Sequence, residues 1–292
     1  MEASAQTHIS PSHIDALLPP QMAAKAEQIG VAKAGICLAK LFTLAVLAGA
    51  FIGLGAAFST TVTAGLNGVP WGLVRLLAGF TFCLGLILVV VAGAELFTGN
   101  NLIVMAWAGG KVSFQSVLRN WIVVYLGNLV GSLATAGLVF FSGQYFFGDR
   151  AVGLNALTIA NAKCALDFIP GLALGVLCNA LVCLAVWLCY SARSVVDKIM
   201  AVIFPITAFV AAGFEHCVAN MYFISLGLFI KQGAPQTFWA GLAKSPADWP
   251  HLTWPGFWLG NLLPVTIGNL IGGSLMVGLV YWFVYLRGGR RA

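Results

Sequence analysis

The residues that could perform chemistry in this chain gather in two matching motifs, each inside a long apolar stretch. Residues 213–220 read GFEHCVAN and residues 93–100 read GAELFTGN, so both follow the pattern G-x-E-x-x-x-x-N. Ionisable side chains are costly in a lipid-facing helix, and at membrane depth they usually mark a functional site. The motifs therefore predict a site at mid-membrane, with each apolar helix broken near its motif so that the polar groups face protein or a pore.

His216 is the strongest single candidate for a functional residue. A lone histidine on an apolar helix face is more often a packed core residue, but His216 follows Glu215 directly and lies at a predicted break. Imidazole can donate a hydrogen bond to an anion and can exchange a proton near neutral pH. Thr98 lies in the other motif, and its hydroxyl could bond a substrate or His216, or instead bond back to its own helix. The two breaks would add free N–H groups and positive dipole ends, which favour an anion.

Glu95 and Glu215 are expected to be structural, because a carboxylate inside the pore would repel an anion. The same spacing separates each of them from an asparagine, Asn100 in one motif and Asn220 in the other. We expect each carboxylate to accept hydrogen bonds from backbone N–H groups that a helix break exposes.

A second pair of motifs indicates an internal repeat. Residues 127–131 read GNLVG and residues 268–272 read GNLIG, and each follows one of the first motifs. With three spans expected in each half, an odd number, the second half must insert upside down relative to the first. Broken helices in an inverted repeat predict a transport site at the bilayer midplane. Asn128 and Asn269 are expected to join helices, although one of them could face the pore.

The composition places the chain among membrane proteins. Hydrophobic residues make up 60% and charged residues 8% of its 292 positions, whereas a soluble domain carries about 25% charged residues. The net charge of +6 does not indicate nucleic-acid binding, because the basic residues occur singly or in pairs between apolar segments. No metal-ligand spacing, nucleophile triad or phosphate loop is visible. Neither an enzyme nor a cofactor is therefore expected.

Apolar segments predict an all-α membrane protein with six transmembrane helices. The second and fifth segments contain the motifs and are expected to be broken, and residues 143–167 are expected to form a loop. The predicted spans lie at about 34–59, 73–105, 119–142, 168–190, 199–230 and 257–286.

Three regions follow from this division. Residues 1–33 are expected to form an N-terminal segment with a short helix on the membrane surface, residues 34–286 a channel domain, and residues 287–292 a basic tail. The positive-inside rule places both termini in the cytoplasm. Of the 15 lysines and arginines, the opposite face receives only Arg75, Arg150, Lys163, Lys231 and Lys244.

Four stretches make the sequence resemble the formate/nitrite transporter family, and within it the formate channels. They are AELFT at 94–98, VCLAVW at 182–187, GFEHCVAN at 213–220 and NLLPVTIGN at 261–269, and the likeness covers about residues 20–287. The resemblance implies a homopentamer of aquaporin-like protomers in the lipid of a bacterial inner membrane. Each protomer would have its own pore for formate, passive or proton-coupled.

The resemblance also implies roles for individual residues. Thr98 and His216 would face the substrate at mid-pore, and Lys163 would attract anions at the vestibule, although by itself it reads as a solvated loop lysine. The residues implied to orient the histidine are Asn179, Glu215, Asn220 and Asn269. Asn269 is also placed with the substrate-facing residues of the pore, and Glu95 with the supporting network. The implied constrictions are Phe82, Leu86 and Leu96 on the cytoplasmic side and Phe209 and Val182 on the periplasmic side.

Other functions remain open from the sequence. A nitrite or hydrosulfide channel would share these motifs. A neutral-solute pore of the aquaporin type should carry paired Asn-Pro-Ala boxes, and the chain has none. A membrane enzyme using His216 and Glu215 would need a second catalytic group or a metal cluster.

Overall fold

The computed structural model describes residues 16–288, which are helical with no strand among them. The first part of the expected N-terminal segment, residues 1–15, and residues 289–292 of the expected basic tail lie outside the described residues. The α-helices are α1 (Pro19–Ala34), α2 (Leu38–Val62), α3 (Trp71–Leu88), α4 (Val104–Ala108), α5 (Phe114–Phe141), α6 (Ala151–Cys164), α7 (Phe168–Ser191), α8 (Val195–Ala211), α9 (Cys217–Gly233), α10 (Gln236–Leu242), α11 (Leu263–Leu270) and α12 (Val280–Tyr285). Shorter 3-10 and π-helical turns are η1 (Val89–Gly93), η2 (Gly99–Ile103), η3 (Gln144–Phe146), η4 (Pro246–Asp248), η5 (Gly256–Leu262) and η6 (Ile271–Leu279).

Within residues 16–288, five helical segments are long and apolar enough to cross a membrane. A further pair, α8 and α9, occupies the place of the predicted fifth span, and each has only 17 residues. At 1.5 Å per residue each is about 26 Å long, shorter than a hydrocarbon core of about 30 Å. The five candidate spans are Leu38–Val62, Trp71–Gly93, Phe114–Phe141, Phe168–Ser191 and Gly256–Tyr285.

Both predicted breaks are present, and a left-handed glycine lies at each. In the first, η1 ends at Gly93 with φ +83°, and the chain runs on in extended conformation at Ala94. In the second, α8 ends at Ala211, and Gly213 has φ +80° before α9 begins. Positive φ is strained for residues with a β-carbon, so glycine at both places is what permits the chain to leave its helix.

Close helix packing explains the two GN motifs. A β-carbon on Gly131 of α5 would lie 2.0 Å from the carbonyl oxygen of Val46 in α2. A β-carbon on Gly272 would lie 2.1 Å from the carbonyl oxygen of Val176 in α7. Small residues let membrane helices approach at backbone distance, and the two halves use them at matching positions.

Asn128 holds the first break against its neighbours. Its side-chain oxygen accepts from the Phe97 N–H at 2.9 Å, and its amide nitrogen donates to the carbonyls of Ala45 (2.8 Å) and Glu95 (3.0 Å). These bonds satisfy backbone groups that the broken helix leaves unpaired. The expectation that this asparagine joins helices is confirmed.

Asn269 does the same for the second break. It accepts from the Cys217 N–H at 2.9 Å and donates to the carbonyls of Gly175 (2.8 Å) and Glu215 (2.9 Å). All of these partners are backbone groups. Its side chain is therefore committed to holding α7, α11 and the break together.

The predicted loop at 143–167 is wrong in part, because α6 occupies most of it. Val152, Ala156, Leu157 and Ala160 are buried, and α6 packs along α9. Several residues on the buried face of this short helix are small, among them Gly153, Ala156 and Ala160, so its hydrophobic periodicity is weak in the sequence. A helix instead of a loop places Lys163 in a defined position, in the last turn of α6.

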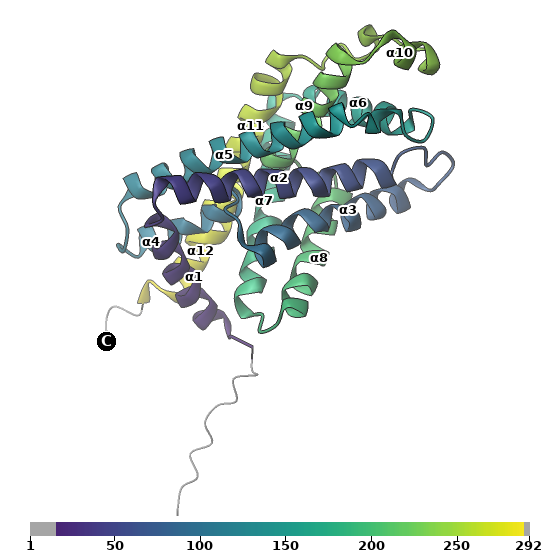
Figure 1. Ribbon diagram of the computed structural model, residues 1–292. Coiled ribbons are helices and arrows are strands. Elements are labelled where there is room, and N and C mark those ends of the chain that lie inside the picture. Colours follow the sequence, from purple (N-terminus) through teal and green to yellow (C-terminus); the bar gives the residue numbers. More distant parts are fainter. Residues whose placement is uncertain (1–15, 289–292) are drawn as a thin grey trace, which may run out of the picture.

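The predicted N-terminal helix is present as α1. Met22, Ala23 and Ala26 pack with Met105 and Trp187 in a small apolar cluster. In Figure 1, α1, α4 and α12 lie together near one end of the molecule, and α6 and α10 lie toward the opposite end.

Candidate functional site

The two breaks meet at Thr98 and His216, as the sequence had raised as one possibility. The hydroxyl oxygen of Thr98 lies 2.9 Å from Nε2 of His216, and both side chains are buried. Thr98 comes from the end of the first break, and His216 is the residue that precedes α9. Segments more than a hundred positions apart in the chain thus place two hydrogen-bonding side chains in contact.

Backbone contacts set the tautomer of His216. Its Nδ1 accepts a hydrogen bond from the Ala219 N–H at 3.0 Å, so the ring caps the first turn of α9. A neutral imidazole has one donor and one acceptor nitrogen. Since Nδ1 accepts, Nε2 carries the proton and donates it to the Thr98 oxygen. The Thr98 hydroxyl hydrogen then remains available to another acceptor.

A cavity of about 390 Å³ lies on one side of His216. Phe209 stacks near the imidazole with ring centroids 5.9 Å apart, and Phe82 meets Phe209 edge-on at 5.8 Å. Among the side chains that line the cavity are Arg75, Phe82, Lys163, Phe209, Glu215 and His216.

This geometry corrects the predicted grouping of the constrictions. Phe82 was placed with Leu86 and Leu96, yet it contacts Phe209 and lines the same cavity. Phe82 lies four residues before Leu86 on α3, about one helical turn. Two side chains on the same face of this helix can therefore lie at different depths, one at the cavity and the other beyond it. Leu86, Leu96 and Val182 are all buried, and none of them lines the cavity.

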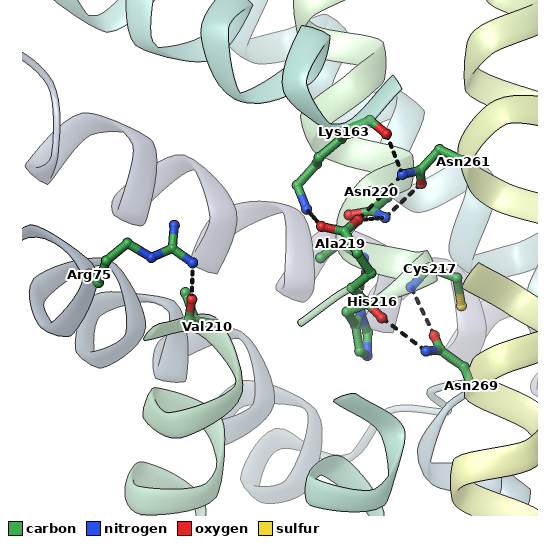
Figure 2. Close-up of polar contacts among 10 residues, drawn as sticks. Arg75, Lys163, Val210, His216, Cys217, Ala219, Asn220, Asn261 and Asn269 are labelled. Carbon is green, nitrogen blue, oxygen red and sulfur yellow. Dashed lines mark hydrogen bonds and ion pairs between the residues drawn. The ribbon is translucent and has the colours of Figure 1, made fainter. Parts of the chain in front are cut away.

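Four residues form a polar cluster beside the cavity, named here the second-half cluster: Lys163, Glu215, Asn220 and Asn261. The Lys163 amino group lies 2.8 Å from Glu215 Oε1. Glu215 Oε2 accepts from the amides of Asn220 (2.6 Å) and Asn261 (3.3 Å), and Asn261 also donates to the Lys163 carbonyl at 2.9 Å. Figure 2 shows Lys163, Asn220 and Asn261 converging above His216.

A matching first-half cluster consists of Lys33, Glu95, Asn100 and Asn120. Lys33 lies 2.8 Å from Glu95 Oε1, and the Asn100 amide donates to Glu95 Oε2 at 2.7 Å. The same amide donates to Asn120 at 2.9 Å, and Asn120 donates to the Lys33 carbonyl at 3.1 Å. Each cluster thus has a lysine–glutamate ion pair, one asparagine that donates to the glutamate and to the other asparagine, and a bond from that second asparagine to the lysine carbonyl. They differ in one bond each, because Lys33 also donates to Asn100 Oδ1 and Asn261 also donates to Glu215 Oε2.

The expectation that Glu95 and Glu215 bond to exposed backbone N–H groups is wrong. Their partners are the amino groups of lysines and the amides of asparagines. The backbone N–H groups of the two glutamates donate to carbonyls of other helices. Glu95 donates to Leu44 of α2 at 3.2 Å, and Glu215 donates to Leu174 of α7 at 3.3 Å. The shared spacing to Asn100 and Asn220 did indicate a real contact in both halves.

Three members of these clusters were missed by the sequence reasoning: Lys33, Asn120 and Asn261. The repeat contained a signal for each. Both lysines stand in the last turn of a short helix before a long one, α1 for Lys33 and α6 for Lys163. Asn120 and Asn261 each precede the asparagine of a GN motif by the same spacing.

Asn179 links the two halves at their centre. Its amide donates to the carbonyls of Thr98 (3.3 Å) and Asn269 (2.7 Å) and to the side chain of Asn101 (2.8 Å). Asn179 thus supports the Thr98 backbone and does not touch the histidine ring that it was expected to orient.

Comparison with known proteins agrees with this architecture. The model of the family described as "Formate/nitrite transporter" matches residues 20–283. The chain is 46% identical to the formate channel FocA of Escherichia coli (strain K12) over 273 residues, 94% of this chain and 96% of that protein. It is 41% identical to FocA of Haemophilus influenzae over 264 residues, 90% of this chain and 93% of that one.

A solved structure described as "Pentameric formate channel with formate bound" superposes with a TM-score of 0.82 at 45% identity. The match covers 86% of this chain and 98% of that one. A family model spanning most of the chain and relatives at this identity leave one conclusion: the chain belongs to the formate/nitrite transporter family.

Proposed function

We propose that this protein is a formate channel, which carries a small monovalent carboxylate across a bacterial inner membrane through a pore in each protomer of a pentamer. The observation that carries this proposal is the 2.9 Å contact between Thr98 and His216, where the two helix breaks meet. Hydrogen-bond donors on an otherwise apolar path select for a small solute with acceptor oxygens. The choice of formate is supported by the relatives, which are named formate channels, and by the solved pentamer that holds formate.

The proposed protomer is aquaporin-like, with six crossings in an inverted repeat. In it, α8 and α9 together make the fifth crossing, and residues 34–286 form the channel domain. The matching breaks, the matching asparagines Asn128 and Asn269, and the matching polar clusters support this proposal. Three crossings per half is an odd number, which requires the two halves to insert in opposite senses.

We place both termini on the cytoplasmic side, since most basic residues gather there. Around Lys25 of α1 this gathering is visible: burial and the nearby charges of Arg193 and Lys198 lower the pKa of its amino group. Reporter fusions at the C-terminus should be active only with reporters that work in the cytoplasm. A C-terminal fusion active only in the periplasm would contradict both the topology and the inverted repeat.

The proposed path begins in the cavity of about 390 Å³, which we place on the outer side of the membrane and call the outer cavity. It runs past two aromatic rings to the Thr98–His216 pair and then through an apolar segment. The rings are those of Phe82 and Phe209, which contact each other at the cavity wall. Leu86, Leu96 and Val182, buried and away from the cavity, are proposed to form the inner segment.

A bare carboxylate should not cross such a segment easily. By Born estimates an unpaired ion in an apolar medium costs on the order of tens of kcal/mol, although real sites soften this. A neutral acid would cross far more readily. We propose that His216 takes up a second proton at Nδ1, releasing the Ala219 N–H, and then gives its Nε2 proton to a formate oxygen. Formic acid would pass on and leave the ring with its proton on Nδ1. Loss of that proton and uptake of another at Nε2 would then restore the tautomer that caps α9.

The test is transport by the purified protein in proteoliposomes, with formate, nitrite and hydrosulfide compared and the internal pH recorded. We expect formate uptake above the protein-free control, accompanied by a pH change. Nitrite or hydrosulfide flux without formate flux would keep the family but change the substrate. Water flux with none of the three anions moving would instead indicate a neutral-solute pore.

A further inference from the structure

The end of α8 brings a negative charge toward the cavity. This helix stops at Ala211, and Val210 in its last turn lines the cavity wall. The last carbonyls of a helix have no intrahelical partner, and together they behave like about half a negative charge. An anion entering the cavity would therefore be repelled by the end of α8 unless a cation lay beside it.

Arg75 is that cation. It reaches from α3, where its Nε donates to the Ala211 carbonyl at 3.1 Å and its Nη2 donates to the Val210 carbonyl. Figure 2 shows the guanidinium pointing to Val210, apart from the cluster around Lys163. Arginine suits this task because its planar fork can bond two acceptors while its charge persists at any physiological pH.

The charge of Arg75 has no carboxylate partner among residues 16–288, whereas the charge of Lys163 does. Lys163 is paired with Glu215 at 2.8 Å, so the pair contributes little net charge to the cavity. Arg75 is half-buried, lines the same cavity, and no ion pair forms with it in the described part of the chain. A guanidinium has five N–H donors, so several remain after the two carbonyls are served.

We propose that Arg75 is the anion-positioning residue of the outer cavity. It offsets the negative end of α8, and its free N–H edge offers a carboxylate or other small oxyanion a two-point hydrogen bond before the anion reaches His216. This deepens the proposed channel function and rests on it. Lys163, which was also predicted to attract anions, lines the same cavity and is paired with Glu215.

The experiment measures initial anion uptake into proteoliposomes, for both formate and nitrite, at about 0.01 M and about 1 M ionic strength, where the Debye length is about 30 Å and about 3 Å. Arg75→Gln removes the charge and keeps hydrogen-bond donors. Arg75→Lys keeps the charge and loses the planar fork. Lys244→Gln is the matched control, because Lys244 is an exposed basic residue that does not line the cavity.

For Arg75→Gln we expect uptake slowed about three- to tenfold at low salt, mainly as a higher half-saturation concentration, and less than about twofold at high salt. Arg75→Lys should stay within about twofold of the wild type at low salt, and Lys244→Gln should match it at both. Gel filtration of each variant checks that the oligomer is intact.

The inference is overturned if Arg75→Gln transports at the wild-type rate at both salt concentrations. It is also overturned if Arg75→Gln and Arg75→Lys lose rate equally at every salt concentration. The second result would make the arginine only a cap for α8. Wild-type protein that moves nitrite but not formate refutes the proposed substrate, and the variants are then judged on nitrite. Wild-type protein that moves neither overturns both proposals.

Discussion

The first-half and second-half clusters have the same composition, one lysine, one glutamate and two asparagines, and share most of their contacts, yet they lie in different surroundings. The second-half cluster borders a cavity of about 390 Å³. The space beside Lys33 has no room for a water molecule, and it is lined by residues of α1 and η2 and by Tyr190. The lysine–glutamate–asparagine cluster therefore stabilises a helix break in both halves. The helices that pack around the cluster decide whether a cavity lies beside it.

The cause of the difference lies in the short helices that carry the lysines. On the first-half side, α1 is tied to the body by more than its lysine cluster: Lys25 donates to the Tyr190 carbonyl at 2.7 Å, and Glu27 pairs with Lys111 at 2.5 Å. On the second-half side, α6 packs on α9, and the cavity there is lined by residues of α3, α6, α8 and α9, among them Arg75 of α3. Matching local sequence thus produces unlike surfaces.

The largest effect should come from His216, which the repeat does not duplicate because Leu96 occupies the matching position of the first motif. His216→Phe removes the donor at the meeting of the two breaks, and loss of a single such donor to a developing or bound charge lowers rates by about a hundredfold or more. We expect proton-linked formate uptake to be lost while the pentamer still assembles. Uptake with the wild-type rate and pH change would mean that the imidazole only packs.

The next largest effect should come from breaking the ion pairs. Glu95→Gln and Glu215→Gln each leave a lysine without its partner, and breaking one side of a buried pair costs about 3–5 kcal/mol. The loss should be greater for Glu215→Gln, because the side chain of Lys163 is 16% exposed and that of Lys33 is 25% exposed.

Chemical denaturation of the two variants in detergent micelles measures this difference. Lys33→Met combined with Glu95→Gln, and Lys163→Met combined with Glu215→Gln, are the matched controls, and each should recover part of the lost stability. A larger loss at Glu95 would reverse the comparison between the clusters.

A smaller effect is expected from the asparagines that bond the backbone of each break. Asn128→Ala and Asn269→Ala each leave buried N–H and carbonyl groups unpaired, at about 1–3 kcal/mol for an unsatisfied group. Since the two side chains make equivalent bonds, the two variants should lose nearly the same free energy of unfolding. Thermal unfolding followed by circular dichroism tests this, and a clearly unequal pair of losses would show that one break is held by other contacts.

The smallest effect is expected at the left-handed glycines. A β-carbon on Gly93 would meet no atom within 4 Å, so Gly93→Ala adds only backbone strain of about 1–2 kcal/mol. A β-carbon on Gly213 would lie 3.5 Å from Nη2 of Arg75, an ordinary contact. Both variants should therefore fold with slightly lowered melting temperatures. Only Gly213→Ala should also change formate uptake at low salt, since it lies beside the guanidinium.

Much of this protein could be predicted from its sequence. The 60% hydrophobic composition implies a membrane protein, and the spacing of glycine, glutamate and asparagine in the two motifs located both breaks. The length of an apolar segment, the number of such segments in each half and the glycine at each break are all visible in the local sequence. They can therefore be identified without knowing which helices pack against them. Thr98 and His216 were identified as candidates for the same reason, because each lies inside a break, and membership of the family is confirmed.

Only the tertiary structure decided which groups those residues meet. The partners of Glu95 and Glu215 are lysines on short helices whose apolar pattern is weak, and one of these helices was predicted to be a loop. Arg75 bonds Ala211 across 136 positions of chain, and nothing near it in the sequence indicates that a helix will end there. A buried charge is stabilised by whichever polar group arrives within hydrogen-bond reach. That distance is set by how whole helices pack, and the local spacing of residues does not contain it.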